Sequence, residues 1–336
     1  MDYNFLLIFL IGFAISAAAA PFVIKLCLRL KAGQNIYHYV ESHKGKQGTP
    51  TMGGIIFILA GAAASLFFIN YNTASGLIIL AVFAGYGILG FLDDFIKIKF
   101  KQNLGLRPYQ KIIGQVSIAL IVAFYVYFNP NIDSSLIIPF TNIKIDLGWG
   151  IIPFVAVVFI AATNSVNLTD GLDGLASGTA MVYLIGFAAI TFLYTNGLVV
   201  GLDNTQIAAN TNVILICLAV AGALLGFLIF NSYPAKIFMG DTGSLALGAL
   251  VAVTACLNGL SFYILIMGFV FVVSSVSVII QVLYYKRTKK RIFLMAPFHH
   301  HFEKCGVHES KITVIYIIVT AVLCAGSVLL TMVCIR

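Results

Sequence analysis

The sequence predicts an all-α, polytopic membrane protein, and three observations support this prediction. Only 10% of the 336 residues are charged, whereas charged residues make up about a quarter of a soluble domain. Hydrophobic residues make up 60% of the chain. They form solid apolar runs near the roughly 20-residue length of a membrane-spanning helix, rather than the alternating ten-residue strands of a membrane barrel.

Ten such runs follow one another along the chain, and each is expected to form a helix. They lie at about 4–30, 51–70, 76–93, 110–128, 150–166, 174–195, 211–230, 242–257, 260–285 and 312–334. The connections are too short for a separate soluble domain, so residues 1–336 are expected to form one transmembrane catalytic domain. Its cytosolic loops are placed at about 31–50, 94–110, 165–173, 231–241 and 286–311.

The distribution of basic residues predicts the orientation. Lys25, Arg29 and Lys31 follow the first span, so the positive-inside rule places the N-terminus outside. Ten alternating spans then put eighteen of the twenty Lys and Arg residues on the cytosolic side, leaving Lys144 and Arg336 outside. The outer loop 129–149 alternates as I-K-I-D-L, which predicts a small outer β-hairpin.

The same topology gathers polar side chains on the cytosolic face, which a bias in lysines alone does not explain. This face receives all six histidines and eight of the twelve acids. They are His38, His43, His299, His300, His301 and His308, with Glu41, Asp93, Asp94, Asp170, Asp173, Asp241, Glu303 and Glu309. Aromatic clusters typical of nucleic-acid binding are absent, so no nucleic-acid partner is expected.

The segment "GFLDDFIKIKFK", residues 90–101, ends an apolar run with two adjacent carboxylates, Asp93 and Asp94. Neighbouring residues on a helix project about 100° apart, so the pair is not expected to chelate one ion symmetrically. One carboxylate is expected to serve a substrate or its metal, and the other a neighbouring lysine or a second substrate such as a nucleotide.

Two further segments combine carboxylates with glycine. In "ATNSVNLTDGLDGLASG", Asn164, Asn167, Asp170 and Asp173 recur every third residue, which either fans them over half of an α-helix or aligns them in a 3₁₀ segment. In "GDTGSLALG", Asp241 precedes a fresh apolar run and fits a helix N-cap. A helix N-terminus also favours phosphate, and the two interpretations agree only if Asp241 turns toward a metal.

The loop "APFHHHFEKCGVHES" and the segment "KGKQGTPTMGGI", with Lys46, are the remaining polar clusters. Zinc sites normally use spaced ligands, so the three histidines favour hydrogen bonds to phosphate and sugar oxygens over a structural zinc. Magnesium prefers one or two carboxylates together with substrate phosphates. The sequence therefore indicates Mg²⁺-dependent phosphoryl transfer at a membrane face, because it combines acids and glycine-rich turns with the basic residues Lys46, Lys97, Arg107 and Lys111.

Taken together, "K-x-GTPTMGG", "FLDDFIK", "NLTDGLDGLA", "GDTGSLALG" and "PFHHHFE" resemble the MraY family, the phospho-N-acetylmuramoyl-pentapeptide transferases, within the polyprenyl-phosphate sugar-1-phosphate transferases. The resemblance runs from about residue 44 to 310. It implies Mg²⁺-dependent transfer of phospho-MurNAc-pentapeptide from its UDP carrier to undecaprenyl phosphate in the bacterial inner membrane. The products would be lipid I and UMP, and lipid I would serve peptidoglycan synthesis and hence cell shape and division. It also raises a homodimer as an expectation.

The resemblance also assigns expected roles to single residues. Asp241 is the metal ligand, Asp93 acts on the lipid phosphate, and Asp94 supports the metal or the diphosphate. The expected substrate contacts are Lys46, Thr51, Lys97 and Lys111 for phosphates, Asn167, Asp170, Gly171, Leu172, Asp173, Asn231 and Phe238 for the nucleotide, and His299, His300 and His301 for the diphosphate or sugar, with His299 counted among the catalytic residues.

Two alternatives stay open at this stage. A transferase of the same group that uses UDP-GlcNAc shares most of the motifs, although "PFHHHFE" favours the first assignment. A secondary transporter also explains ten spans, but it places acids near the bilayer midplane and often shows an internal repeat, and no strong repeat is present. The mechanism of the transferase can be weighed from the charge of its lipid substrate. A phosphate monoester is already mostly dianionic at neutral pH because its second pKa is about 6. Asp93 is therefore expected to position the phosphate rather than remove a proton, and direct attack by the lipid phosphate is favoured over a covalent aspartyl intermediate.

Overall fold

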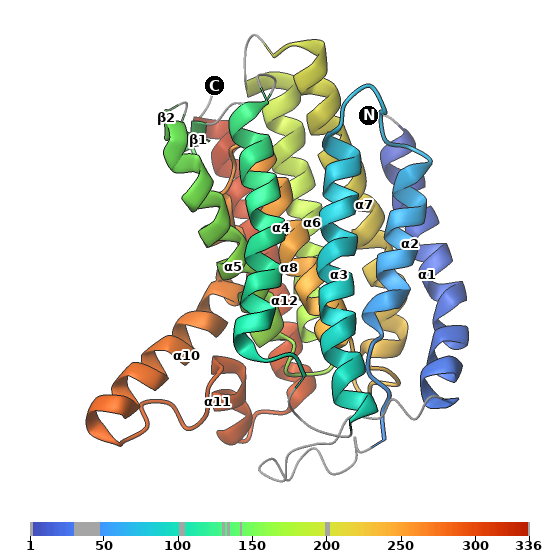
Figure 1. The fold of residues 1–336 in the computed structure, drawn as a ribbon, viewed down its shortest axis with the longest axis vertical. Helices are drawn as coiled ribbons and strands as arrows, with labels where there is room; N and C mark the ends of the chain where they lie inside the picture. Colours follow the sequence, from blue (N-terminus) through green and yellow to red (C-terminus); the bar gives the residue numbers. More distant parts are fainter. Residues whose placement is uncertain are drawn as a thin grey trace.

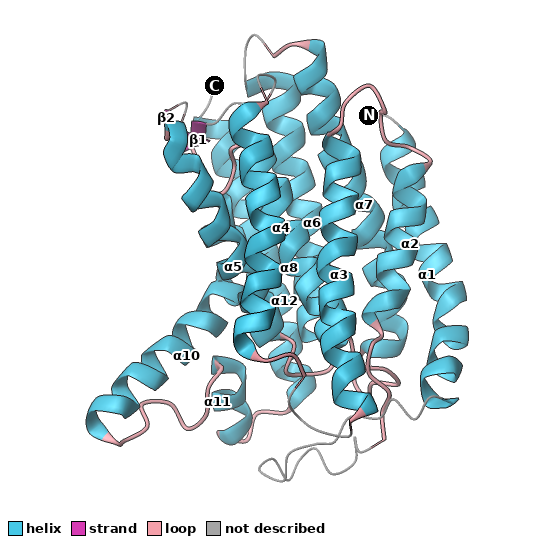
Figure 2. Cartoon of the chain, viewed as in Figure 1, coloured by secondary structure: helices cyan, strands magenta, loops and turns pink. Residues whose placement is uncertain are grey.

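The computed structural model describes residues 3–29, 48–100, 105–129, 132, 135–141, 143–198 and 202–334. Most of these residues are helical (Figures 1 and 2). The long helices are α1 (Tyr3–Arg29), α3 (Ser75–Lys99), α4 (Pro108–Phe128), α5 (Ile151–Thr169), α6 (Leu175–Leu193), α7 (Asn204–Asn231), α8 (Gly240–Leu257), α10 (Phe269–Thr288) and α12 (Glu309–Cys334). The shorter elements are α2 (Gly54–Leu66), α9 (Tyr263–Met267), α11 (Phe298–Lys304), a 3₁₀ turn (Gly148–Gly150) and a π-helical turn (Tyr194–Leu198).

The nine long helices are all apolar enough to cross a bilayer, counting the described residues alone. The chain is therefore a multi-pass, all-α membrane protein, as its composition predicts. A two-stranded antiparallel sheet is the predicted hairpin: β1 (Ser135–Ile137) pairs with β2 (Lys144–Asp146), with Leu136 opposite Ile145. The hairpin and both chain ends lie at one end of the bundle (Figure 1), which we call the hairpin end.

Helix α8 forms the centre of the bundle. Every residue from Thr242 to Leu257 is buried, because α3, α5 and α2 pack around it. Small side chains allow this close packing, which is the usual way helices associate in a membrane, where no hydrophobic driving force exists between them. The polar first turn of α8 is thereby fixed against its neighbours at the end opposite the hairpin, which we call the acid end.

Two of the ten predicted spans differ from the structure. The span predicted at 51–70 is a helix of only 13 residues, α2, which at 1.5 Å per residue is about 20 Å long. The residues before it are drawn into backbone pairing instead: Phe238 N–H donates to Pro50 O (2.8 Å), and Gly53 N–H donates to Phe238 O (2.8 Å). The apolar run therefore begins as a loop that is fastened to the segment leading into α8.

The span predicted at 260–285 is broken at Gly268, where α9 ends and α10 begins. Figure 1 shows α10 leaving the bundle obliquely toward the acid end, and α11 begins next to the middle of α10, where Phe298 N–H donates to Ser277 Oγ (3.1 Å). Burial along α10 is confined to Val270, Phe271, Ser274 and Ser277, which lie in its first half. The apolar run 260–285 therefore forms two helices, α9 and α10, that point in different directions.

Candidate active site

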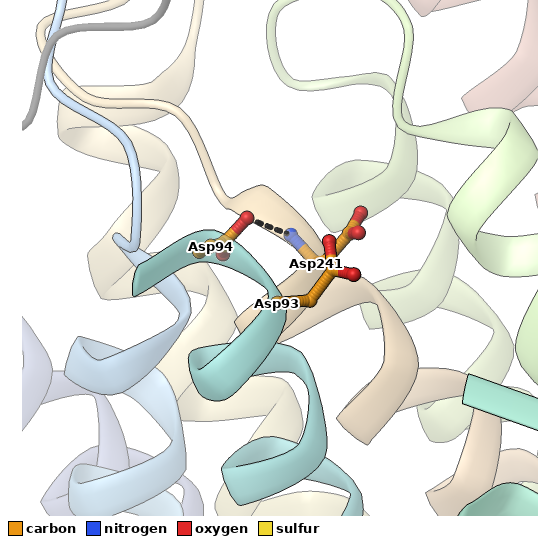
Figure 3. A group of neighbouring side chains, drawn as sticks. All are labelled: Asp93, Asp94 and Asp241. Carbon is orange, nitrogen blue, oxygen red and sulfur yellow. Dashed lines mark hydrogen bonds between the residues drawn. The ribbon is translucent and has the colours of Figure 1, made fainter. Parts of the chain in front are cut away.

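Three carboxylates converge at the acid end, between α3 and α8. Asp93, Asp94 and Asp241 each offer an oxygen atom, and these atoms lie within 4.8 Å of one another. Asp93 and Asp94 do project differently from α3, as their adjacency predicts, but the first turn of α8 places Asp241 next to both (Figure 3). Within the described residues this is the group of acids, histidines or cysteines able to hold a metal ion.

Asp94 caps the N-terminus of α8 from the neighbouring helix. Its Oδ1 accepts from Asp241 N–H (3.2 Å), and its Oδ2 accepts from Thr242 N–H (2.9 Å) and from Thr242 Oγ1 (2.8 Å). These backbone groups have no partner inside the helix, and a carboxylate there also meets the positive end of the helix dipole. Asp94 therefore fixes the position of Asp241, a function that its place in the sequence does not reveal.

The alternative of Asp241 as an N-cap is wrong. Met239 occupies the N-cap position and makes no side-chain cap, while Asp241 lies inside the first turn. The carboxylate of Asp241 instead faces two ammonium groups, Lys97 Nζ at 2.8 Å and Lys111 Nζ at 3.0 Å from Oδ2. It is turned outward from the helix toward the space that a cation would occupy.

Lys97 shows how strongly this space attracts positive charge. Its Nζ lies 2.5 Å from Asp93 Oδ2, 2.8 Å from Asp241 Oδ2 and 3.9 Å from Asp94 Oδ1. Asp93 also accepts from Leu106 N–H at 2.9 Å, which fastens the chain before α4 to the cluster. Lys97 and Lys111, expected at substrate phosphates, are thus placed on the carboxylates.

The Asn and Asp residues spaced by three along α5 do not act as one set. Helix α5 stays α-helical to Thr169, so these side chains diverge. Asn167 Nδ2 donates to Asp241 Oδ1 (2.6 Å) and Ser244 Oγ (2.8 Å), whereas Asn164 Nδ2 donates to Gln115 Oε1 (3.2 Å). Asn167 therefore belongs to the acid cluster and Asn164 to a separate polar contact inside the bundle.

The loop after α5 brings Asp170 near the acids. Burial raises the pKa of Asp170 to about 8, and the negative charges of Asp241, Asp94 and Asp173 act in the same direction. A cation bound among these groups would oppose that shift, because a nearby positive charge favours the ionised form. Asp170 thus adds a fourth carboxyl group to a region that already contains three.

Asp173 and Asn231 hold the backbone near the site. Asp173 Oδ2 accepts from Ala235 N–H (2.9 Å), and Asp173 N–H donates to Glu309 Oε1 (2.8 Å). Asn231 accepts from Ser177 Oγ (2.6 Å) and donates to Ile237 O (3.0 Å). Sequence reasoning placed Glu309 on the correct face but not at the site, because no local motif connects it to Asp173.

Two of the three consecutive histidines lie against the same loop. His299 is fully buried, and its ring packs on the backbone of Gly171, where a Cβ would also come within 3.0 Å of His300 Nε2. Burial lowers the pKa of His299 to about 3, with the nearby His300 acting in the same direction. His301 faces away, since its Nδ1 accepts from Leu294 N–H (3.2 Å) and its ring stacks on Phe298.

The other predicted substrate contacts lie around the cluster or outside the described residues. Thr51 is buried beside Gly240, Phe238 is half-buried in the segment paired with residues 50–53, and Leu172 is buried in the apolar core. Lys46 lies outside the described residues.

Comparison with known proteins gives the family. The model of glycosyl transferase family 4 matches residues 76–259, and phospho-N-acetylmuramoyl-pentapeptide-transferase signature 1 matches residues 46–58. A phospho-N-acetylmuramoyl-pentapeptide-transferase of Clostridium botulinum (strain Eklund 17B / Type B) is 46% identical over 316 residues, which cover 94% of this chain and 93% of that relative.

The chain belongs to the phospho-N-acetylmuramoyl-pentapeptide-transferase family. Proteins of the same name from Clostridioides difficile (45% identical, 94% of each chain) and Bacillus velezensis (44% identical, 91% of each chain) agree with this assignment. The chain is thus an enzyme of the phosphotransferase class that acts in peptidoglycan precursor synthesis, and the three converging acids lie within the part of this transferase that the family model matches.

Proposed function

We propose that this transferase moves phospho-MurNAc-pentapeptide from UDP-MurNAc-pentapeptide to undecaprenyl phosphate, releasing UMP and forming lipid I. An oxygen of the lipid phosphate attacks the sugar-bearing phosphorus of the UDP donor, and the bond from that phosphorus to the bridging oxygen breaks, so that UMP leaves. The observation that carries the proposal is the convergence of Asp93, Asp94 and Asp241 with two lysines at one end of a membrane bundle.

The cluster fits a magnesium ion by its donor set. Three carboxylates offer oxygen ligands within one coordination sphere, and the space among them already holds the ammonium of Lys97. We infer that Asp241 would hold Mg²⁺, with Asp93 beside it, because Asp94 is occupied by the α8 backbone. Bound Mg²⁺ would neutralise charge on the phosphate oxygens during transfer.

The chain's own residues would then position the reactants. Lys111 and Lys97 can turn from Asp241 to phosphate oxygens once a metal neutralises the acids, since Lys side chains are flexible point charges. Asp93, which is 3% exposed, would help to position the lipid phosphate for attack rather than remove a proton from it. Asp170 and Gly171 would supply the wall on which the nucleotide or sugar would lie, with the buried ring of His299 packed behind Gly171.

The cytosolic placement of this site in the bacterial inner membrane is part of the proposal. The basic residues Lys25 and Arg29 end α1 on the acid end, and Lys97 and Lys99 end α3 there. By the positive-inside rule this end faces the cytosol, where a UDP-linked donor is available.

The deciding experiment incubates purified protein in detergent with UDP-MurNAc-pentapeptide, undecaprenyl phosphate and Mg²⁺, and measures UMP release. Asp241→Ala is expected to abolish release while its unfolding midpoint stays within a few degrees of the wild type. UDP-GlcNAc in place of the natural donor is expected to give no UMP. Release from UDP-GlcNAc alone, or counterflow of labelled donor in vesicles without any product, would contradict the proposal.

A further inference from the structure

The far end of α10 carries an unusual concentration of positive charge. Five of the six residues 286–291 are Lys or Arg, and no Asp or Glu occurs between Asp241 and Glu303. Every residue from 282 to 292 is exposed. We call residues 286–291 the basic tip. The positive-inside rule explains cations on this face in general, but it does not explain their concentration at the end of one protruding helix.

The side chains leading to the basic tip change character in a fixed order. Exposed apolar residues come first, with Ile279 56% and Leu283 58% exposed, and two exposed tyrosines, Tyr284 and Tyr285, follow. The five cations come last. This order matches the layers of a bilayer, in which hydrocarbon gives way to the aromatic-rich interface and then to the headgroups. A soluble acidic partner would not require the exposed apolar and aromatic residues.

The chain that follows the basic tip is fastened back onto α10. Gln281 Oε1 accepts from Phe293 N–H (2.9 Å) and Ile292 N–H (3.2 Å), and Ser277 Oγ accepts from Phe298 N–H (3.1 Å). Phe298 begins α11, whose next residue is the buried His299. The position of residues 277–281 of α10 therefore helps to set where α11 meets the loop at Gly171.

We propose that the basic tip binds the headgroups of anionic membrane phospholipid, and that this contact steadies residues 292–298 and α11. Anionic headgroups attract each juxtamembrane Lys or Arg, and the attraction acts within a Debye length of about 8–10 Å. No side chain of α10 beyond Ser277 is buried, so within the described residues the protruding half is held only by its contacts with the chain that follows it, such as the hydrogen bonds of Gln281. The contact is with the bilayer, so it does not depend on the reaction proposed above.

A tryptophan beside the basic tip reports which lipid is near it. The sequence has one tryptophan, Trp149, in the turn before α5, so Ile292→Trp in a Trp149→Phe background gives a single local probe. Vesicles contain phosphatidylcholine and phosphatidylglycerol in fixed proportion, with the brominated chains on one lipid or the other at equal bromine content. We expect brominated phosphatidylglycerol to quench about threefold more strongly, and high salt to remove the difference.

A neutral variant and a matched control test the cause. The variant combines Lys286→Gln, Arg287→Gln, Lys289→Asn, Lys290→Gln and Arg291→Gln; asparagine is used at 289 because the backbone there is left-handed, with φ of 57°. The control removes two cations at the same end of the bundle, Lys25→Gln and Arg29→Gln. The lipid preference is expected to vanish in the neutral variant and persist in the control, with equal unfolding midpoints in detergent for both proteins.

Hydrogen exchange tests the second half of the proposal. Amides of residues 292–302 are expected to exchange several-fold more slowly in vesicles with phosphatidylglycerol than in phosphatidylcholine alone, and only when the basic tip is intact. Equal quenching by the two lipids in the wild-type background, or a preference that survives in the neutral variant, would overturn the lipid contact. Unchanged exchange despite a clear lipid preference would overturn the steadying of α11.

Discussion

Replacing Gly90 by alanine tests whether the acid cluster depends on the close approach of α3 to α8. A Cβ at position 90 would overlap the carbonyl oxygen of Asp241 and lie 2.7 Å from the Cα of Thr242. Carbon atoms in contact stay about 3.5–4.0 Å apart, so the helices must separate by about 1 Å. Both obstructing groups are backbone, and no side-chain rotation relieves the overlap.

The expected magnitude follows from this displacement. Overpacking costs about 1–3 kcal/mol, and the better helix propensity of alanine offsets about 1 kcal/mol of that. We therefore expect the unfolding free energy of Gly90→Ala to fall by up to about 2 kcal/mol. The same movement carries Asp241 away from Asp94, and a misplacement of about 1 Å at a reacting centre can lower the rate by about 100-fold.

Gly85→Ala is the matched control on the same helix. A Cβ there meets only Ile118 Cδ1, at 3.4 Å, which is a flexible side-chain end. This variant is expected to keep wild-type activity and to gain up to about 1 kcal/mol of stability. UMP release at saturating substrate and the unfolding midpoint in detergent are measured for both variants. Equal behaviour of the two alanine variants would refute the idea that the spacing of α3 and α8 sets the site.

Three further predictions concern charge. Asp94→Asn replaces one of the two oxygens that accept from the N-terminus of α8 by a donor, so we expect a loss of about 1 kcal/mol in unfolding free energy, of the size of a lost N-cap. We also expect weaker Mn²⁺ binding by electron paramagnetic resonance, and unchanged Mn²⁺ affinity would contradict the cap. Lys97→Gln leaves the acids underneutralised, so its unfolding midpoint should fall more in EDTA than in excess Mg²⁺, and an equal fall in both would argue against a cation site. The His299 pKa of about 3 lies below its usual value of about 6.5. The unfolded chain therefore binds more protons between these pH values, and stability falls as pH drops through them, by at most about 1.4 kcal/mol per unit. The Asp170 pKa of about 8 lies above its usual value of 3.8, so stability in EDTA falls as pH rises toward 8. Thermal melts of His299→Gln and Asp170→Asn should each lose the corresponding slope, and a slope that persists would show that another group titrates.

The order of the site motifs was predictable because it follows local chemistry. Adjacent carboxylates at the end of an apolar run, and Asp241 ahead of a fresh run, indicated a metal-assisted phosphate site at one membrane face, and the structure brings these three residues together. The role of Asp94 was not predictable, because the N–H groups that it accepts from are 147 and 148 residues away in the sequence. The same limit applies to Asp173 and Glu309, which meet across 136 residues.

By itself the sequence determined the membrane class, the approximate spans, the hairpin and the face on which acids and histidines gather, because hydrophobic length and charge asymmetry act on each segment separately. Only the tertiary structure decided that α2 is short, that the ninth apolar run bends at Gly268, and that Lys97 and Asn167 both turn to Asp241. These outcomes depend on which helix surfaces pack together, and a side chain's partner across such a contact is not encoded in its own neighbours along the chain.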